Sequence, residues 1–154
     1  MNTEHTDIRD YIDGDLDHLP IESINRLLAA VVDHTKIPLS RLVAPKGTPG
    51  ARTHYVSMSR QLAYLVLSGH EPHGRACLSH EDIATVMNRD RSTVSSGLSR
   101  VYKALRDGHG AYELMLTRVL EQYDAGENRA AFERIRDSYD SQVYRQRLPG
   151  RITQ

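Results

Sequence analysis

The stretch of residues 78–105 constrains the fold more than any other part of this chain, because it combines two helical patterns with a tight polar turn. Ser79, with Asp82 three residues later, resembles a capping arrangement for a short helix through residue 87. Polar residues at 88–91 predict a turn, and a longer helix is expected from there to about residue 105. A short helix, a tight turn and a longer helix together indicate a helix-turn-helix.

The longer helix has two faces of different chemistry. Its apolar face carries Val94, Leu98, Val101, Tyr102 and Leu105, and the opposite face carries Ser92, Ser96, Ser99 and Lys103. Serine is a mediocre helix former, and a solvated face normally prefers Glu, Lys or Gln. The serine-rich face therefore suggests selection for close contact with a partner. An ordinary solvated face is the alternative interpretation.

These residue types suit a helix that enters the major groove of DNA. Small side chains allow close approach, and hydroxyl groups can meet base edges and phosphates. Arg89, Arg91 and Thr93 lie at the N-terminal end of the helix, which is the end that usually contacts the bases. We therefore expect the helix over 92–105 to bind in the major groove.

Charge is unevenly distributed along the chain, although its formal net charge is zero. Residues 1–35 hold two basic and eight acidic side chains, residues 36–106 hold eleven and four, and residues 107–154 hold seven and eight. A basic middle segment favours DNA, because neutralising phosphates releases counterions and supplies most non-specific affinity. Chance fluctuation is the alternative explanation of this partition.

The rest of the chain is helical in pattern and predicts an all-α bundle. Amphipathic spacing predicts a helix over 21–32, and apolar residues on most sides of 55–68 predict a helix in the middle of the bundle. A short helical turn is expected near 38–42, before a loop rich in Pro and Gly. Two further helical segments are expected at 111–123 and 127–146, and no alternation typical of strands is evident.

Several features of residues 21–106 occur together in one known family. They are an opening helix followed by Ile-Pro-Leu-Ser-Arg-Leu, a basic loop, a helix beginning near Arg60-Gln61, and the motif Asp90-Arg91-Ser92-Thr93-Val94. With them the segment resembles the C-terminal, DNA-binding domain of the bacterial replication initiator DnaA. The resemblance implies that the last motif contacts major-groove bases. It also implies that an arginine of the basic loop over 46–54, which aligns with Arg52, enters the adjacent minor groove.

We therefore predict DNA contacts at Arg52, Arg60, Arg89, Asp90, Arg91, Ser92, Thr93, Ser96, Ser99, Arg100 and Lys103. The family usually has His and Thr where this chain has Arg91 and Ser92, so the preferred DNA sequence stays open. Met58 and Ser68 stand where the family tends to place basic phosphate contacts, which predicts fewer such contacts here. Residues 70–77 resemble an insertion relative to the family.

No catalytic or nucleotide-binding motif accompanies this segment. Pro45-Lys46-Gly47-Thr48 lacks the glycine spacing and the Gly-Lys-Ser/Thr order of a Walker motif, and the ATPase domain of the initiator hardly fits in this length. We expect a regulator of replication initiation or transcription that binds double-stranded DNA, is not an enzyme and needs no cofactor. The alternative is a protein-interaction module that binds a replication or transcription protein without contacting DNA.

One cluster of side chains has the ligand types for tetrahedral zinc. His70, His73, Cys77 and His80 form His-x2-His-x3-Cys-x2-His. Against a metal site, all four ligands would crowd into eleven residues, and Ser79 with His80 is needed to start a helix. We therefore favour a solvated loop and rank zinc below DNA binding.

The last predicted helix carries an apolar stripe, formed by Phe132, Ile135, Tyr139 and Val143. Such a stripe most often docks on the core of its own chain. Otherwise it is the seam of a homodimer, which would suit DNA binding because two helix-turn-helix units contact paired half-sites.

These patterns predict three parts of the chain. They are an acidic flexible arm over 1–18, a DNA-binding domain over 19–124 and a helical appendage over 125–154. The single cysteine and the polar, acidic N-terminus indicate a cytoplasmic protein. The longest apolar run, 62–67, is far below the roughly 20 residues that cross a bilayer.

Overall fold

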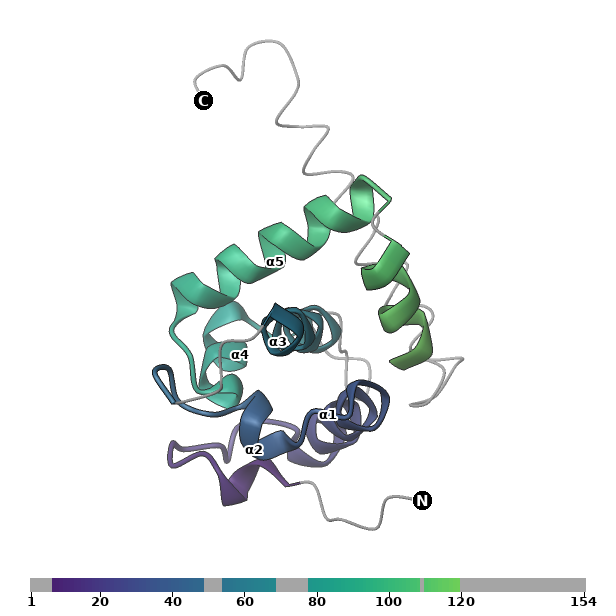
Figure 1. Cartoon of the computed structure of the whole chain (residues 1–154). Coiled ribbons are helices and arrows are strands. Elements are labelled where there is room, and N and C mark those ends of the chain that lie inside the picture. Colours follow the sequence, from purple (N-terminus) through teal and green to yellow (C-terminus); the bar gives the residue numbers. More distant parts are fainter. Residues whose placement is uncertain (1–6, 49–53, 69–77, 109, 120–154) are drawn as a thin grey trace, which may run out of the picture.

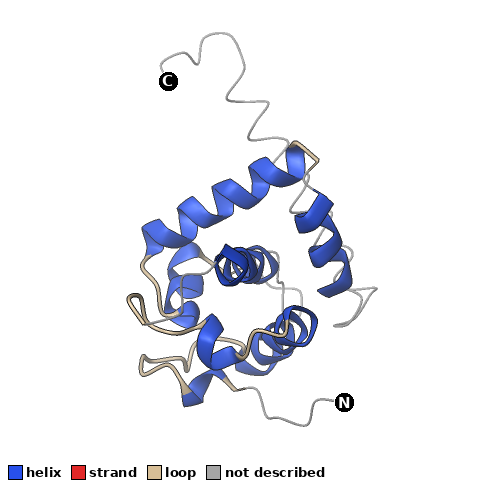
Figure 2. Cartoon of the chain, viewed as in Figure 1, coloured by secondary structure: helices blue, strands red, loops and turns tan. Residues whose placement is uncertain are grey.

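The computed structural model describes residues 7–48, 54–68, 78–108 and 110–119. Its helices are η1 (Ile8–Asp10), α1 (Ile21–Thr35), α2 (Leu39–Leu42), α3 (His54–Ser68), α4 (His80–Met87) and α5 (Arg91–Arg106), followed by a helical segment over 110–119. This described part contains no strand (Figure 2), so the prediction of an all-α fold is confirmed. None of its helices is long and apolar enough to cross a membrane.

Helix α3 lies at the centre of the bundle, as its apolar residues on most sides predicted. Figure 1 shows it almost end-on, with α5 passing above it and α1 below it. It packs against α1, α2, α4 and α5, and every side chain from Leu62 to Leu67 is buried. Because α3 shares its apolar surface with four other helices, it fixes where each of them lies.

Helix α1 buries one face and ends in a left-handed residue. Its buried apolar side chains are Ile24, Leu27, Leu28, Ala30 and Val31. At its C-terminus Lys36 has a φ of 63°, and the N–H of Lys36 donates to the carbonyl of Val32 at 2.8 Å. The Tyr55 hydroxyl, at the start of α3, donates to the carbonyl of Thr35 at 2.9 Å. This bond ties the end of α1 to the beginning of α3.

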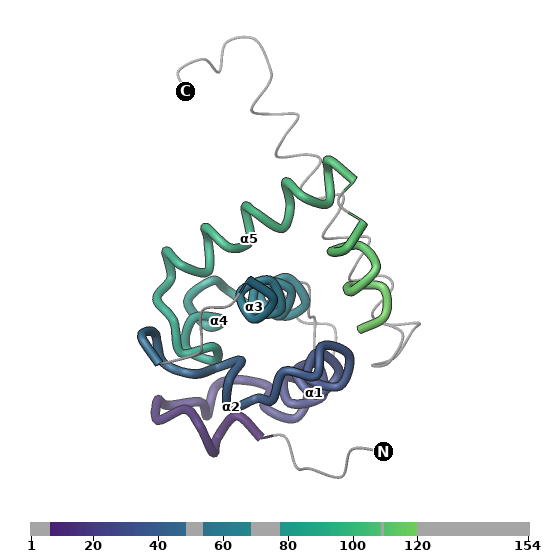
Figure 3. Tube along the Cα trace, viewed as in Figure 1, coloured from purple at the N-terminus to yellow at the C-terminus, as the bar shows by residue number. Residues whose placement is uncertain are grey.

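The helical segment over 110–119 covers the bundle from a further side and confirms the predicted helix 111–123 as far as residue 119 (Figure 3). Tyr112, Met115, Leu116 and Val119 of this segment are buried. The Tyr112 hydroxyl donates to Oε1 of Gln61 at 2.6 Å. The segment is therefore joined to the central helix α3 by packing and by a hydrogen bond.

The expectation of a flexible acidic arm over 1–18 is wrong for residues 7–18, the part of it that the structure describes. Residues 7–19, which we call the N-terminal strap, contribute Ile8, Ile12, Leu16 and Leu19 to the hydrophobic core. The main-chain N–H of Ile8 also donates to the side chain of Asn25 in α1, at 2.9 Å. The acidic residues between these apolar anchors stay at the surface, which is why composition alone suggested an unpacked arm.

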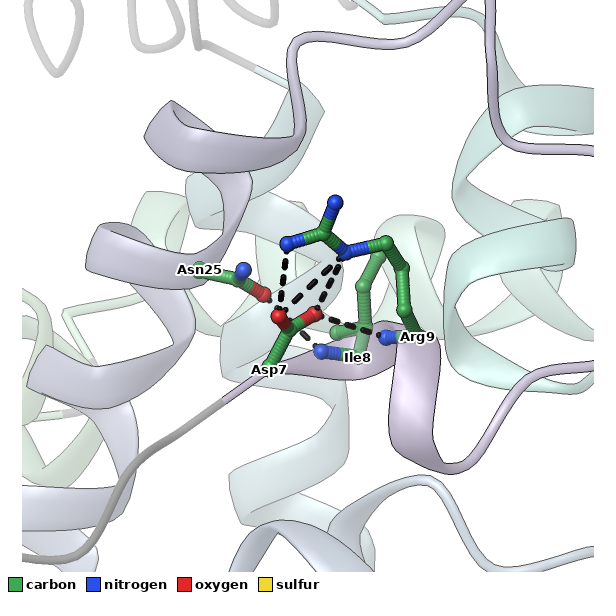
Figure 4. Close-up of polar contacts among 4 residues, drawn as sticks. All are labelled: Asp7, Ile8, Arg9 and Asn25. Atoms are coloured by element: carbon green, nitrogen blue, oxygen red, sulfur yellow. Dashed lines mark hydrogen bonds and ion pairs between the residues drawn. The ribbon is translucent and has the colours of Figure 1, made fainter.

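One further contact orders the start of the N-terminal strap, and another joins the strap to α4. Asp7 caps η1 and pairs with Arg9 at 2.8 Å (Figure 4), and hydrogen bonds from Arg9 hold the pKa of this carboxyl well below its usual range. Nε2 of His18 lies 3.3 Å from Oδ1 of Asp82, in the first turn of α4. The strap therefore joins α1 to the first helix of the helix-turn-helix.

Candidate nucleic-acid interface

Helices α4 and α5 and the turn between them have the local structure that the sequence predicted. The Ser79 hydroxyl caps α4 by accepting from the N–H of Asp82 at 3.1 Å. Asn88 ends α4 with a φ of 59°, in the left-handed region that Asn tolerates better than most residues. Asp90 caps α5 by accepting from the N–H of Thr93 at 2.8 Å. Each boundary is therefore set by the residue type at that position.

A close approach between α3 and α5 fixes the orientation of α5. Gly97 of α5 is buried, and a β-carbon at this position would lie 2.8 Å from the ring of Tyr64 in α3. Tyr64 is itself buried, which raises the pKa of its hydroxyl. Only glycine permits this separation of the two helices, and it sets which face of α5 is turned outward.

The outward face of α5 is the hydroxyl-rich face predicted from the sequence. Its exposed side chains are Arg91, Ser92, Ser96, Ser99, Arg100 and Lys103, whereas Val94, Gly97, Leu98, Val101 and Leu105 are buried. Thr93 and Tyr102 are half-buried at the margins of the two faces. Within the described residues no carboxylate forms an ion pair with Arg91, Arg100 or Lys103. The face therefore offers small hydroxyl groups and three exposed cations.

Asp90 acts as a structural cap at the first turn of this face. Hydrogen bonds from Thr93 and then from the Ser92 hydroxyl lower the pKa of Asp90 to about 2. The charge of Lys46 contributes to the same lowering of the pKa. Arg89, the residue before Asp90, bonds the carbonyl of Ala44, so the loop that carries Lys46 is attached next to the N-terminus of α5. Asp90, which the sequence predicted as a DNA contact, thus bonds within its own helix.

Arg60 does not lie on this face, and its prediction as a DNA contact is wrong. Its side chain is only 6% exposed, and burial lowers the pKa of its guanidinium. Nε donates to the carbonyl of Leu42 at 2.9 Å, and Nη2 donates to the carbonyl of Arg41 at 3.1 Å. Both carbonyls belong to the end of α2, where a helix leaves acceptors without partners. Arg60 caps α2 from inside the bundle.

Arg89 is half-buried, and its guanidinium is directed to main-chain carbonyls. Nη1 donates to the carbonyl of Ala44 and, at 3.0 Å, to that of Asn88. Its own N–H donates to the carbonyl of Ala84 at 2.9 Å. The prediction that Arg89 projects toward DNA therefore needs correction, because Nη1 of its guanidinium bonds the loop that follows α2.

Sequence reasoning overlooked Lys46 as an individual residue of the interface, although it placed the loop over 46–54 there. Lys46 is exposed in a turn closed by Thr48, whose N–H and hydroxyl both reach the carbonyl of Pro45, at 3.1 and 2.7 Å. Gly47 has a φ of 92°, which this turn requires and which glycine adopts without strain. The sequence signal that could have identified Lys46 is a lysine between Pro45 and Gly47, in the loop already expected to contact DNA.

Several other predicted site residues lie outside the described part of the chain. They are Arg52, the candidate zinc ligands His70, His73 and Cys77, and the apolar stripe of Phe132, Ile135, Tyr139 and Val143. The fourth candidate ligand, His80, is described, and its Nδ1 lies 2.8 Å from the hydroxyl of Ser95 in α5. This contact joins α4 to α5. The described residues include no group of three or more side chains placed to hold a metal ion.

Comparisons with family models, with curated proteins and with solved structures find no match to this chain.

Proposed function

We propose that the chain binds double-stranded DNA at specific sequences, with α5 in the major groove, and regulates replication initiation or transcription. The observation that carries this proposal is the capped α4–α5 unit, whose outward face joins small hydroxyl side chains to three exposed cations. A groove-binding helix needs close approach, hydrogen-bonding groups and positive charge together, and an ordinary solvated helix needs none of them.

Other features support the same function. The resemblance of residues 21–106 to the C-terminal domain of DnaA implies major-groove contacts around Arg91, Ser92 and Thr93. The turn at 45–48 follows Ala44, whose carbonyl accepts from Arg89 just before α5 begins. From there a loop can reach the flanking DNA backbone or the minor groove. In this proposal Arg52 keeps its predicted contact with the minor groove, and Lys46, Arg100 and Lys103 contact phosphates.

The experiment is a DNA-binding titration across a salt series, first with random duplex DNA and then with a duplex selected from a random pool. Binding should weaken steeply as salt rises, with a slope of roughly 0.9 per phosphate neutralised. Absence of binding, or a flat salt dependence, would contradict the proposal. It would favour a protein-interaction module instead, for which the exposed acidic residues of the N-terminal strap, Asp10, Asp13, Asp15 and Asp17, are the supporting observation.

Two substitutions separate base contact from backbone contact. Arg91 lies in the first turn of α5 and can offer a bidentate fork to guanine, whereas Lys103 lies three turns later. Arg91→Ala should cost roughly 1–3 kcal/mol on the selected duplex and much less on random DNA. Lys103→Ala should weaken both alike and lower the salt slope by about one unit. Equal losses on both duplexes for Arg91→Ala would make Arg91 a phosphate contact only.

A further inference from the structure

The end of α2 is bonded to two other parts of the fold through consecutive carbonyl groups. Arg60, from α3, donates to the carbonyls of residues 41 and 42. Nδ2 of Asn88 donates to the carbonyl of residue 43 at 3.3 Å, and Nη1 of Arg89 donates to that of residue 44. Asn88 and Arg89 belong to the turn of the helix-turn-helix, 45 residues away in sequence.

The turn that carries Lys46 begins directly after these carbonyls. Its first residue, Pro45, follows the residue to which Arg89 is bonded, and its last residue, Thr48, bonds back to Pro45. The turn therefore has a closed shape of its own and a fixed attachment to the segment that leads into α5. Arg89 directly precedes Asp90, the cap of α5, so the turn is attached next to the N-terminus of that helix.

We propose that Asn88 and Arg89 are positioning residues, which hold the turn at 45–48 beside the first turn of α5 so that Lys46 and α5 meet DNA as one rigid unit. This inference rests on the proposed DNA binding. In it Arg89 acts through Lys46 and makes no contact with DNA. A turn that is already fixed loses little conformational freedom when it binds, so its lysine contributes more of its electrostatic attraction.

Arg89 joins the helix-turn-helix to the loop after α2, because its main chain and its side chain bond to different elements. Its N–H extends the capping of α4 at Ala84, while its guanidinium reaches the loop after α2. The side chain of Arg89 is half-buried, and the same Nη1 also donates to the carbonyl of Asn88 at 3.0 Å. Through these bonds Arg89 is suited to hold the loop after α2 against the helix-turn-helix.

The test is a double-mutant cycle of Lys46→Ala and Arg89→Met, measured on a duplex selected by the full chain. If Arg89 acts through Lys46, each single variant should bind several-fold more weakly and show a salt slope lower by roughly one unit. The double variant should then bind no more weakly than Lys46→Ala alone. The pair Lys103→Ala and Arg89→Met is the control, and its effects should add because the two residues share no partner.

A second variant keeps the test valid if Arg89→Met does not fold, as checked by circular dichroism at the assay temperature. Asn88→Gly removes the bond to residue 43 while allowing the left-handed backbone. Because Asn88 is uncharged, a lower salt slope in Asn88→Gly would show that another residue has lost its phosphate. In a chain that already carries Lys46→Ala, adding Asn88→Gly should not lower the salt slope any further.

Two results would overturn the inference while leaving the proposed function intact. One is additive losses for Lys46→Ala and Arg89→Met, with the slope of the double variant lower by two units, since Arg89 would then contact a phosphate itself. The other is an unchanged slope for folded Asn88→Gly together with unchanged binding of folded Arg89→Met. If the unmodified chain showed no salt-dependent binding to duplex DNA, the proposed function would fail, and this inference would fail with it.

Discussion

At the scale of single residues, the most restrictive position is Gly97. A β-carbon there would meet two ring atoms of Tyr64 at 2.8 Å, and Tyr64 is 2% exposed, so its ring has no open space to enter. In an interior of this density, even one additional methyl group must displace a helix or force an unfavourable rotamer.

We therefore expect Gly97→Ala to lower the free energy of unfolding by about 1–3 kcal/mol, despite the gain of roughly 1 kcal/mol that alanine brings to a helix interior. Chemical denaturation followed by circular dichroism measures the change. Gly110→Ala is the matched control, because Gly110 begins the segment 110–119 and a β-carbon there meets nothing within 4 Å. If both variants were equally stable, the close contact between α3 and α5 would be disproved.

The lowered pKa of Asp90 predicts how stability depends on pH. Its pKa is about 2 in the folded chain, and an unfolded Asp has a pKa of about 3.9, so the folded state binds its proton less readily. The stabilisation is complete above pH 4 and is lost as the pH falls toward 2. Asp90→Asn keeps a capping side chain but does not titrate, so its urea midpoint should fall less between pH 5 and about 3.

The control for this measurement is Asp13→Asn, which removes an exposed carboxylate that caps no helix. Its midpoint should follow that of the original chain across the same pH range. Direct titration of the carboxyl carbon of Asp90 by NMR provides an independent check. A midpoint near that of a solvated aspartate would contradict the capping geometry.

At the scale of elements, α2 shows how a very short helix is maintained. It spans only Leu39–Leu42, and an isolated helix of this length is unstable in water. Leu39 and Leu42 are buried, and Arg60 donates to the carbonyls of the last two residues of the helix. Asn88 and Arg89 bond the carbonyls of the two residues that follow it. Its stability therefore comes from the helices around it.

Replacement of Arg60 should weaken the attachment of this element to α3, although Arg60 itself lies outside the DNA-binding face. Arg60→Met fills a similar volume but leaves the carbonyls of Arg41 and Leu42 without their guanidinium donor, a loss of roughly 2–4 kcal/mol. Thermal unfolding measures this loss. At temperatures where Arg60→Met is folded, Asn88 and Arg89 still bond residues 43 and 44, so the salt slope of DNA binding should equal that of the original chain. Arg100→Ala, at an exposed position of α5, should instead lower the slope by about one unit while leaving stability nearly unchanged.

At the scale of the whole molecule, the N-terminal strap extends the core beyond the bundle of α-helices. Ile8 is fully buried, and Ile12, Leu16 and Leu19 are nearly so. Burial of one such side chain contributes roughly 1.5–3 kcal/mol, and a domain is typically stable by only about 5–15 kcal/mol in total. Four anchors of this kind are thus comparable with the whole free energy of unfolding.

We therefore expect deletion of residues 1–19 to unfold the chain or to lower its thermal midpoint by more than any single substitution discussed above. Ile8→Ala alone should cost about 2–4 kcal/mol, because it leaves a cavity beside α1. Tyr11→Ala, in the same strap but at a side chain that is 44% exposed, is the control and should change stability little. Native-like stability of the deletion variant would show that the strap contributes nothing to the core.

The sequence by itself determined the features that depend on neighbouring residues. The first residues of α4 and α5 follow from the caps Ser79 and Asp90, whose side chains accept from main-chain N–H groups three residues away. The division of α5 into an apolar and a hydroxyl-rich face follows from helical periodicity. Local geometry is enough for both, so both could be predicted without knowing the fold.

Only the tertiary structure decided the fates of Arg60, Arg89 and the N-terminal strap. Arg60 meets its carbonyl acceptor 18 residues away, and Arg89 meets its acceptor 45 residues away. The sequence cannot distinguish an arginine that contacts a DNA phosphate from one that bonds a main-chain carbonyl left without a helical partner. Which of the two an arginine meets depends on which helix ends and loops are brought together when the other helices pack on α3. The strap was misjudged for the same reason, since four widely spaced apolar residues form a core only when α1 and α4 already provide the surface to cover.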